Sequence, residues 1–121
     1  MKYTLSDIFN KKSCKNWGSF WLVLSNFLDC FKREPNQFDF SLPCEHITPE
    51  IDAFIAATIE QLMLEANLPV PSWVYDKKYI LENPFFPSGL KGDYRFIAIK
   101  ESPLSFSVRQ IFVTKNVLDR V

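Results

Sequence analysis

The chain has 121 residues, of which 47% are hydrophobic, and its 14 basic side chains are balanced by 14 acidic ones. This composition is too apolar and too weakly charged for a disordered chain, and the length suits a single globular domain. No apolar run reaches the roughly 18 residues that a membrane-spanning helix needs. The N-terminal stretch is interrupted by Asp7 and several lysines, so we expect no signal peptide and a cytoplasmic protein.

The first predicted element is a helix over residues 17–32. Apolar residues recur in it at helical spacing, as on one face: Trp17, Trp21, Leu24, Leu28 and Phe31. Further apolar residues widen this face, so we expect the helix to lie in the core or, alternatively, in the seam of a homodimer. Pro35 ends the helix.

Residues 34–48 are predicted to form a loop, because Pro35 and Pro43 interrupt regular structure. Within this loop Phe38 and Phe40 alternate with polar residues. We expect both rings to attach the loop to the core.

A second helix is predicted to begin after Thr48, which is a suitable cap, with Pro49 at the first helical position. Acidic residues lie in its first turn, where their negative charge interacts favourably with the positive end of the helix dipole. The expected buried stripe consists of Ile51, Ile55, Ile59, Leu62 and Ala66, widened by Phe54 and Met63. Asn67 suits the left-handed conformation that ends a helix, and two prolines follow it.

The region from Val70 onward is rich in prolines and aromatic residues. We expect a short helix over residues 76–81 and an extended stretch at residues 85–87. Residues 93–100 suit a strand or a helix, and the helix is favoured because Ser102-Pro103 has the pattern of a further helix start, over residues 104–111. The predicted class is therefore all-α, a small helical bundle with an irregular Pro/aromatic segment and at most one short β pair.

Three stretches of this region form a recognisable series. They read LPVPSW at 68–73, NPFFPSGL at 83–90 and SPLSFSVRQIF at 102–112. The series resembles a poorly characterised bacterial family of small proteins with LPxPxW, Pro-aromatic-aromatic-Pro and SPxxFxxRxIF motifs in this order. In that family this portion often follows an Xre-type helix-turn-helix domain, and the neighbouring gene often encodes a nucleotidyltransferase-like protein. The resemblance covers residues 48–121 and implies a toxin–antitoxin-like or regulatory module.

The chain departs from that family before residue 50. The N-terminal part is too short, and too interrupted by Pro35 and Pro43, to hold a complete Xre domain. The resemblance therefore implies that this chain keeps the portion that contacts a partner protein and does not bind operator DNA.

The predicted function is a non-enzymatic, antitoxin-like protein-binding module whose partner is a nucleotidyltransferase-like toxin. Prolines pre-order the backbone around several aromatic side chains, and rigid aromatic groups are typical anchors of interfaces. The candidate partner-binding residues are Trp73, Tyr75, Phe85, Phe86, Arg95 and Arg109. Residues 35–69 carry six acidic side chains and neither Lys nor Arg, so they form a solvated helix face or a contact for a basic partner.

Two other functions compete with this prediction. A nucleic-acid-binding regulator would use a basic N-terminal group: Lys11, Lys12, Lys15, Lys32 and Arg33. A small phosphoryl-handling enzyme would clamp a phosphate between Arg95 and Arg109, although no glycine-rich loop accompanies them. Alternatively, Arg109 fixes a helix end or forms an ion pair with an acidic residue of the fold or of the partner.

The cysteines and the single histidine predict no metal or cofactor. Cys14, Cys30, Cys44 and His46 lack the close ligand pairs that structural zinc sites use. A Cys44–His46 nucleophile pair would also need an orienting third group and an oxyanion site, for which the sequence gives no signal.

Overall fold

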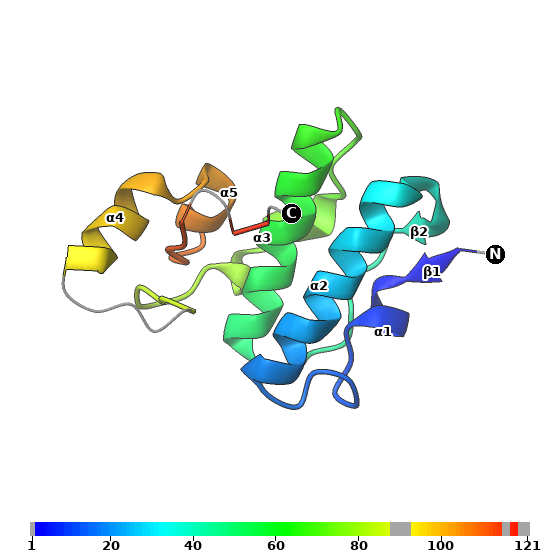
Figure 1. The fold of residues 1–121 in the computed structure, drawn as a ribbon, viewed down its shortest axis with the longest axis horizontal. Helices are drawn as coiled ribbons and strands as arrows, with labels where there is room; N and C mark the ends of the chain where they lie inside the picture. The colour runs from blue at the N-terminus through cyan, green and yellow to red at the C-terminus, as the bar shows by residue number, and fades with distance from the viewer. Residues whose placement is uncertain (1, 88–92, 115–116, 119–121) are drawn as a thin grey trace. The chain divides into compact units, whose positions relative to one another are not determined.

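The computed structural model describes residues 2–87, 93–114 and 117–118. The chain divides into two compact units whose main segments are Met1–Ile47 and Thr48–Asp119. The two units correspond to the blue-to-cyan and the green-to-red parts of Figure 1.

The first unit is organised by the predicted aromatic helix, α2, which spans Trp17–Arg33. It begins with a reciprocal cap, because the Asn16 side chain accepts the Ser19 N–H and the Ser19 hydroxyl accepts the Asn16 N–H. Its buried residues are Phe20, Leu24, Phe27, Leu28 and Phe31. The buried face is therefore rotated from the predicted one: Trp17 and Trp21, expected on its centre line, are only half-buried.

Two short strands and two short helical turns complete the first unit. Strand β1 (Tyr3–Thr4) pairs in parallel with β2 (Phe38–Asp39), which confirms one short β pair. Helix α1 (Leu5–Ile8) follows β1, and the 3-10 turn η1 (Pro35–Gln37) precedes β2 (Figure 1).

The loop after α2 is attached by its phenylalanines, as predicted. The ring of Phe27 on α2 meets the rings of Phe38 and Phe40 edge-on, with centroid separations of 5.2 and 6.1 Å. Phe38 and Phe40 stack on each other at 5.9 Å. Phe9, which follows α1, also meets Phe27 edge-on, at 5.5 Å, so Phe27 contacts aromatic rings from both α1's end and the loop.

The second unit is built on α3, which spans Pro49–Glu65 and confirms the predicted second helix. The Thr48 hydroxyl accepts the Ile51 N–H at 3.1 Å, and Asn67 has the left-handed φ of 55°. The helix is buried on nearly every side: Ile51, Ala53, Phe54, Ile55, Ala56, Ala57, Thr58, Ile59, Leu62 and Met63. Ala66, expected in the buried stripe, is exposed because it caps the last turn.

The short helix predicted at residues 76–81 is replaced by two 3-10 turns, η2 (Ser72–Tyr75) and η3 (Lys77–Tyr79). Helical hydrogen bonding stops before Leu81 because the Leu81 N–H donates to the Arg109 carbonyl at 3.1 Å. A tertiary backbone contact therefore overrides the local helical pattern here.

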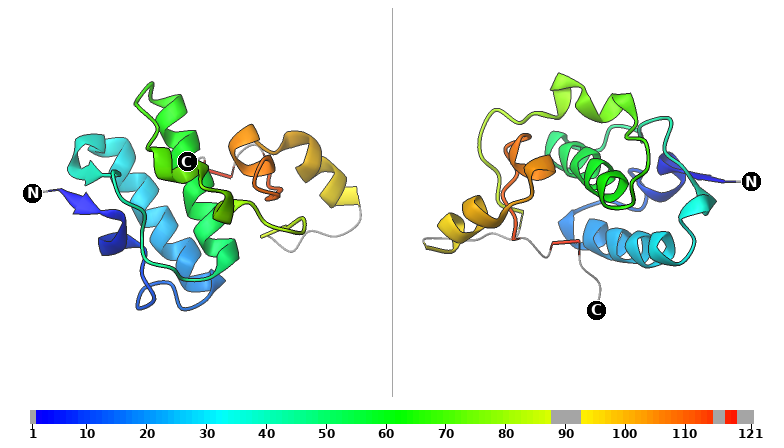
Figure 2. Two further views of the ribbon diagram at one scale, coloured as in Figure 1. Left: turned by 180° about the vertical axis from the view of Figure 1, so that it is seen from behind. Right: turned by 90° about the horizontal axis from the view of Figure 1, so that it is seen from above.

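Residues 93–101 form helix α4 (Asp93–Glu101), in agreement with the favoured prediction. Helix α5 is shorter than expected and spans only Leu104–Ser107, because Gln110 adopts a left-handed φ of 65° and the chain turns back. The Ser102 hydroxyl does not cap α5 as predicted and instead donates to the Ile111 carbonyl at 3.1 Å. Helix α5 packs against α3 (Figures 1 and 2).

The described elements are helices and helical turns with one two-stranded sheet, which confirms the predicted mainly α class. None of the helices formed by the described residues has the length and apolar character to cross a membrane.

Replacing the cap of α3 tests how strongly this helix supports the fold. In Thr48→Ala the Ile51 N–H loses its acceptor, so the free energy of unfolding should fall by about 1 kcal/mol. Thr48→Ser keeps the hydroxyl and should retain most of that stability. Urea denaturation followed by circular dichroism measures both variants, and equal losses in the two would contradict the cap.

Candidate functional site

Arg109 is, among the described residues of the second unit, the most deeply buried charged side chain, with 3% of its surface exposed. Its Nη1 lies 2.6 Å from Glu60 Oε1 on α3. Its Nη2 donates to the Val74 carbonyl of η2 at 2.6 Å, and Nη1 also donates to the Ser105 carbonyl of α5. The Arg109 network, formed by these four residues, therefore joins three elements that are far apart in sequence.

The burial of this ion pair makes it important for the fold. A charge removed from water is tolerated only when other groups replace the lost hydration, and the acceptors on Glu60, Val74 and Ser105 do so for Arg109. Glu60 itself is 13% exposed, so its carboxylate is also largely withdrawn from water. Removing one partner would leave the other charge buried without compensation.

Tyr75 adds an accessible group to this network. Partial burial raises the pKa of the Tyr75 phenol, and the negative charge of Glu60 and a hydrogen bond to its carboxylate raise it further, while Arg109 acts in the opposite direction. Tyr75 is nevertheless 58% exposed. We infer that its hydroxyl end approaches Glu60 while much of its ring remains accessible to a partner.

The segment after η3 is tied to the end of the second unit by backbone hydrogen bonds. The Phe85 N–H donates to the Gln110 carbonyl at 2.8 Å, and the Phe112 N–H donates to the Phe85 carbonyl at 2.9 Å. The Phe86 ring packs against the Phe112 ring at 5.6 Å, and the Arg95 guanidinium lies 4.9 Å from the centre of the Phe86 ring. These contacts hold the Pro-Phe-Phe-Pro stretch in one arrangement.

Bonds within this unit connect the three sequence stretches LPVPSW, NPFFPSGL and SPLSFSVRQIF. The SPxxFxxRxIF stretch supplies Arg109, which binds the carbonyl of Val74 directly after the LPxPxW stretch. The same stretch pairs through Phe112 with Phe85 of the Pro-Phe-Phe-Pro motif. Trp73 meets the ring of Tyr79 edge-on at 5.9 Å. Two of the stretches are thus in direct contact, and the third is joined to them through the neighbouring Val74.

The predicted partner-binding residues differ in accessibility. Tyr75 and Arg95 are exposed, whereas the remaining aromatic residues of the set, Trp73, Phe85 and Phe86, are half-buried. Arg109 is buried and bound within the fold, so its assignment as a partner contact is replaced by the internal ion pair that the sequence also allowed. The same burial removes Arg109 from a phosphate clamp with Arg95.

Two residues of this region, Ile80 and Glu60, were not identified from the sequence. Ile80 is 51% exposed directly after η3, close in sequence to the predicted aromatic residues. Glu60 was expected on a solvated helix face, but it accepts the bond from Arg109. The sequence did not indicate that Glu60 pairs with Arg109, because the two residues lie 49 positions apart along the chain.

The three cysteines lie at different depths: Cys14 is buried, and Cys30 and Cys44 are half-buried. Within residues 2–87, 93–114 and 117–118, no three His, Cys, Asp or Glu side chains gather closely enough to hold a metal ion.

The chain was compared with known proteins at three levels. No protein-family model, no curated protein and no solved structure matches it.

Truncating the arginine tests the importance of the Arg109 network. Arg109→Met should lower the free energy of unfolding by about 3–5 kcal/mol, because Glu60 and two carbonyls lose their partner. The exposed Arg95→Met should cost less than about 1 kcal/mol. Chemical denaturation provides both values. Adding Glu60→Gln to Arg109→Met should recover part of the loss, and similar small losses in both arginine variants would contradict the network.

The raised pKa of Tyr75 predicts a pH dependence of stability. Its folded pKa lies above the ordinary value of 10.0, so the unfolded chain ionises first. The resulting stabilisation is fully present below the unfolded pKa and is lost as the pH rises through the folded pKa. Denaturation at increasing alkaline pH should therefore show a smaller loss of stability in Tyr75→Phe than in the native chain. An identical alkaline loss in both proteins would exclude a perturbed Tyr75.

Proposed function

We propose that this protein is a non-enzymatic protein-binding module, and that it binds its partner through residues 72–86 of the second unit. The observation that carries the proposal is an anchored apolar surface. Tyr75 and Ile80 are 58% and 51% exposed, yet they lie on short turns whose backbone is held by Arg109. We use the name aromatic surface for three side chains together: the aromatic Trp73 and Tyr75 and the aliphatic Ile80.

Anchoring matters because binding a flexible segment costs the entropy of ordering it. Here the carbonyl of Val74, within η2, and the N–H of Leu81, after η3, are bonded to Arg109. The chain is therefore held on both sides of η3 before a partner arrives. Large apolar side chains presented in this way are typical hot spots of interfaces.

The resemblance of residues 48–121 supports a more specific partner. We propose an antitoxin-like role, in which the aromatic surface binds a nucleotidyltransferase-like toxin. Such a partner needs a positively charged cleft for the phosphates of a nucleotide, and Glu65 is an exposed acidic residue on α3 that could face such a cleft. Glu60 is not available for this contact, because Arg109 holds it.

Binding of a nucleic acid is the second candidate, and one observation favours it. Lys11, Lys12 and Lys15 are all exposed in the segment that precedes α2. An affinity for DNA or RNA that falls steeply with salt, and that is lost when these lysines are replaced by glutamine, would favour this function over partner binding.

Co-expression with the proteins encoded beside its gene tests the partner-binding proposal. We expect a stoichiometric complex, and Tyr75→Ala and Ile80→Ala should each weaken it by about 1–3 kcal/mol because they truncate exposed anchors. Ile97→Ala is the matched control, because Ile97 is a similarly exposed apolar residue on α4.

Light scattering and calorimetry measure the mass and the affinity of the complex. A monomer that retains no neighbouring protein at low salt would exclude the proposed function. A complex that all three variants form equally well would remove the aromatic surface from the interface.

A further inference from the structure

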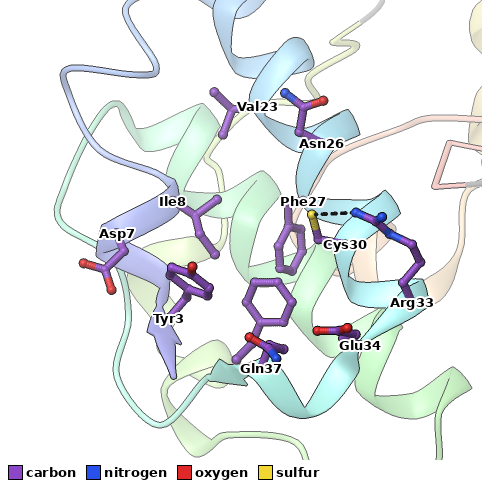
Figure 3. A pocket seen from close by; sticks show the side chains of 11 residues that line it. Tyr3, Asp7, Ile8, Val23, Asn26, Phe27, Cys30, Arg33, Glu34 and Gln37 are labelled. Carbon is purple, nitrogen blue, oxygen red and sulfur yellow. Dashed lines mark hydrogen bonds between the residues drawn. The ribbon is translucent and has the colours of Figure 1, made fainter. Parts of the chain in front are cut away.

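A separate pocket lies wholly within the first unit. Its volume is about 550 Å³, and it opens between α1, α2 and the segment from η1 to β2 (Figure 3). The rings of Phe27, Phe38 and Tyr3 line it, together with the aliphatic side chains of Ile8 and Val23. A cavity of this size and lining is typical of sites for small molecules.

The aromatic lining has a defined geometry. Phe27 and Phe38 meet edge-on at 5.2 Å, and Tyr3 lies 6.2 Å from Phe38 with its ring tilted by 43°. These rings belong to α2, β2 and β1, and the pairing of the two strands fixes the relation between Tyr3 and Phe38. A planar ring could therefore add further edge-on and offset contacts to a group that is already ordered.

Charged groups of both signs border the pocket. Arg33 and Glu34 lie along one rim, and Asp7 lies across from them (Figure 3). The Asp7 carboxylate accepts the Thr4 N–H at 2.9 Å, so it already serves the cap of α1. Arg33 donates to the Cys30 sulfur at 3.6 Å, and a thiol is a weak acceptor that leaves most of the guanidinium donors for a stronger one.

These charges determine the class of ligand. Two carboxylates and one guanidinium border the pocket, so a plain anion such as a phosphate or an aromatic acid would be repelled overall. A ligand that carries a carboxylate for Arg33 and an ammonium group for Glu34 would satisfy both side chains. Arg33 and Glu34 are consecutive residues, and the two charges of an α-amino acid are likewise close neighbours.

We propose that this pocket binds a free aromatic α-amino acid. The ring lies among Phe27, Phe38 and Tyr3, the carboxylate binds Arg33, and the ammonium group binds Glu34. The site lies in the first unit and is independent of partner binding by the aromatic surface of the second.

Titration of the full chain with L-phenylalanine, followed by protein NMR, tests the proposal. Binding in the micromolar to millimolar range should shift the signals of residues that line the pocket. Phenethylamine lacks the carboxylate and 3-phenylpropionate lacks the ammonium group, so each should bind at least about fivefold more weakly. Arg33→Gln and Glu34→Gln should weaken the binding of L-phenylalanine by a similar factor.

Lys32→Gln is the matched control, because Lys32 is an exposed cation of the same helix that does not line the pocket. It should bind L-phenylalanine like the native chain. All three substitutions lie at exposed positions and should leave the circular dichroism spectrum unchanged. An absence of signal shifts at millimolar L-phenylalanine, or equal affinities for the three ligands or for the three variants, would overturn the proposal.

Discussion

The buried guanidinium of Arg109 is the constraint on which the second unit depends. A charge that is 3% exposed must be fully compensated, and the acceptors that compensate it belong to α3, η2 and α5. These elements can satisfy Arg109 only if they come together in one arrangement. The backbone carbonyl of Arg109 also accepts the Leu81 N–H, so the same residue holds the chain on both sides of η3. Arg109 thus orders residues 74–81, and the bonds of Phe85 to Gln110 and Phe112 hold the stretch that follows.

This arrangement relates the fold to the proposed function. Residues 72–81 have no long helix or sheet of their own, yet Tyr75 and Ile80 are presented at defined positions on them. Tyr75 also approaches Glu60, so an accessible side chain is connected to the buried ion pair. A partner that binds Tyr75 would therefore contact a side chain that is linked to this ion pair. The pocket of the first unit is a separate site, with its own aromatic lining and its own charges.

The long helices could be predicted because their signals are local. Thr48 and Pro49 begin α3, and the left-handed Asn67 follows its end, all recognisable within a few residues. The prediction of a helix at residues 76–81 was wrong because the Leu81 N–H donates to the carbonyl of Arg109, 28 positions later. Arg109 itself was recognised as a candidate residue, but its partner Glu60 could not be identified, since α3 carries several carboxylates and spacing does not distinguish between them. The aromatic residues of the site could be identified from the proline-rich and aromatic composition of their segment. Their exposure could not be predicted, because it depends on tertiary contacts.

We propose that the aromatic surface of the second unit is an interface for a protein partner. Hydrogen–deuterium exchange of the chain alone and in its co-purified complex tests this claim most directly, because it locates the contact without any substitution. We predict that the partner slows the exchange of backbone amides at residues 72–82, where the Tyr75 and Ile80 side chains are exposed. Protection confined to the first unit, with unchanged exchange at residues 72–82, would contradict an interface at the aromatic surface.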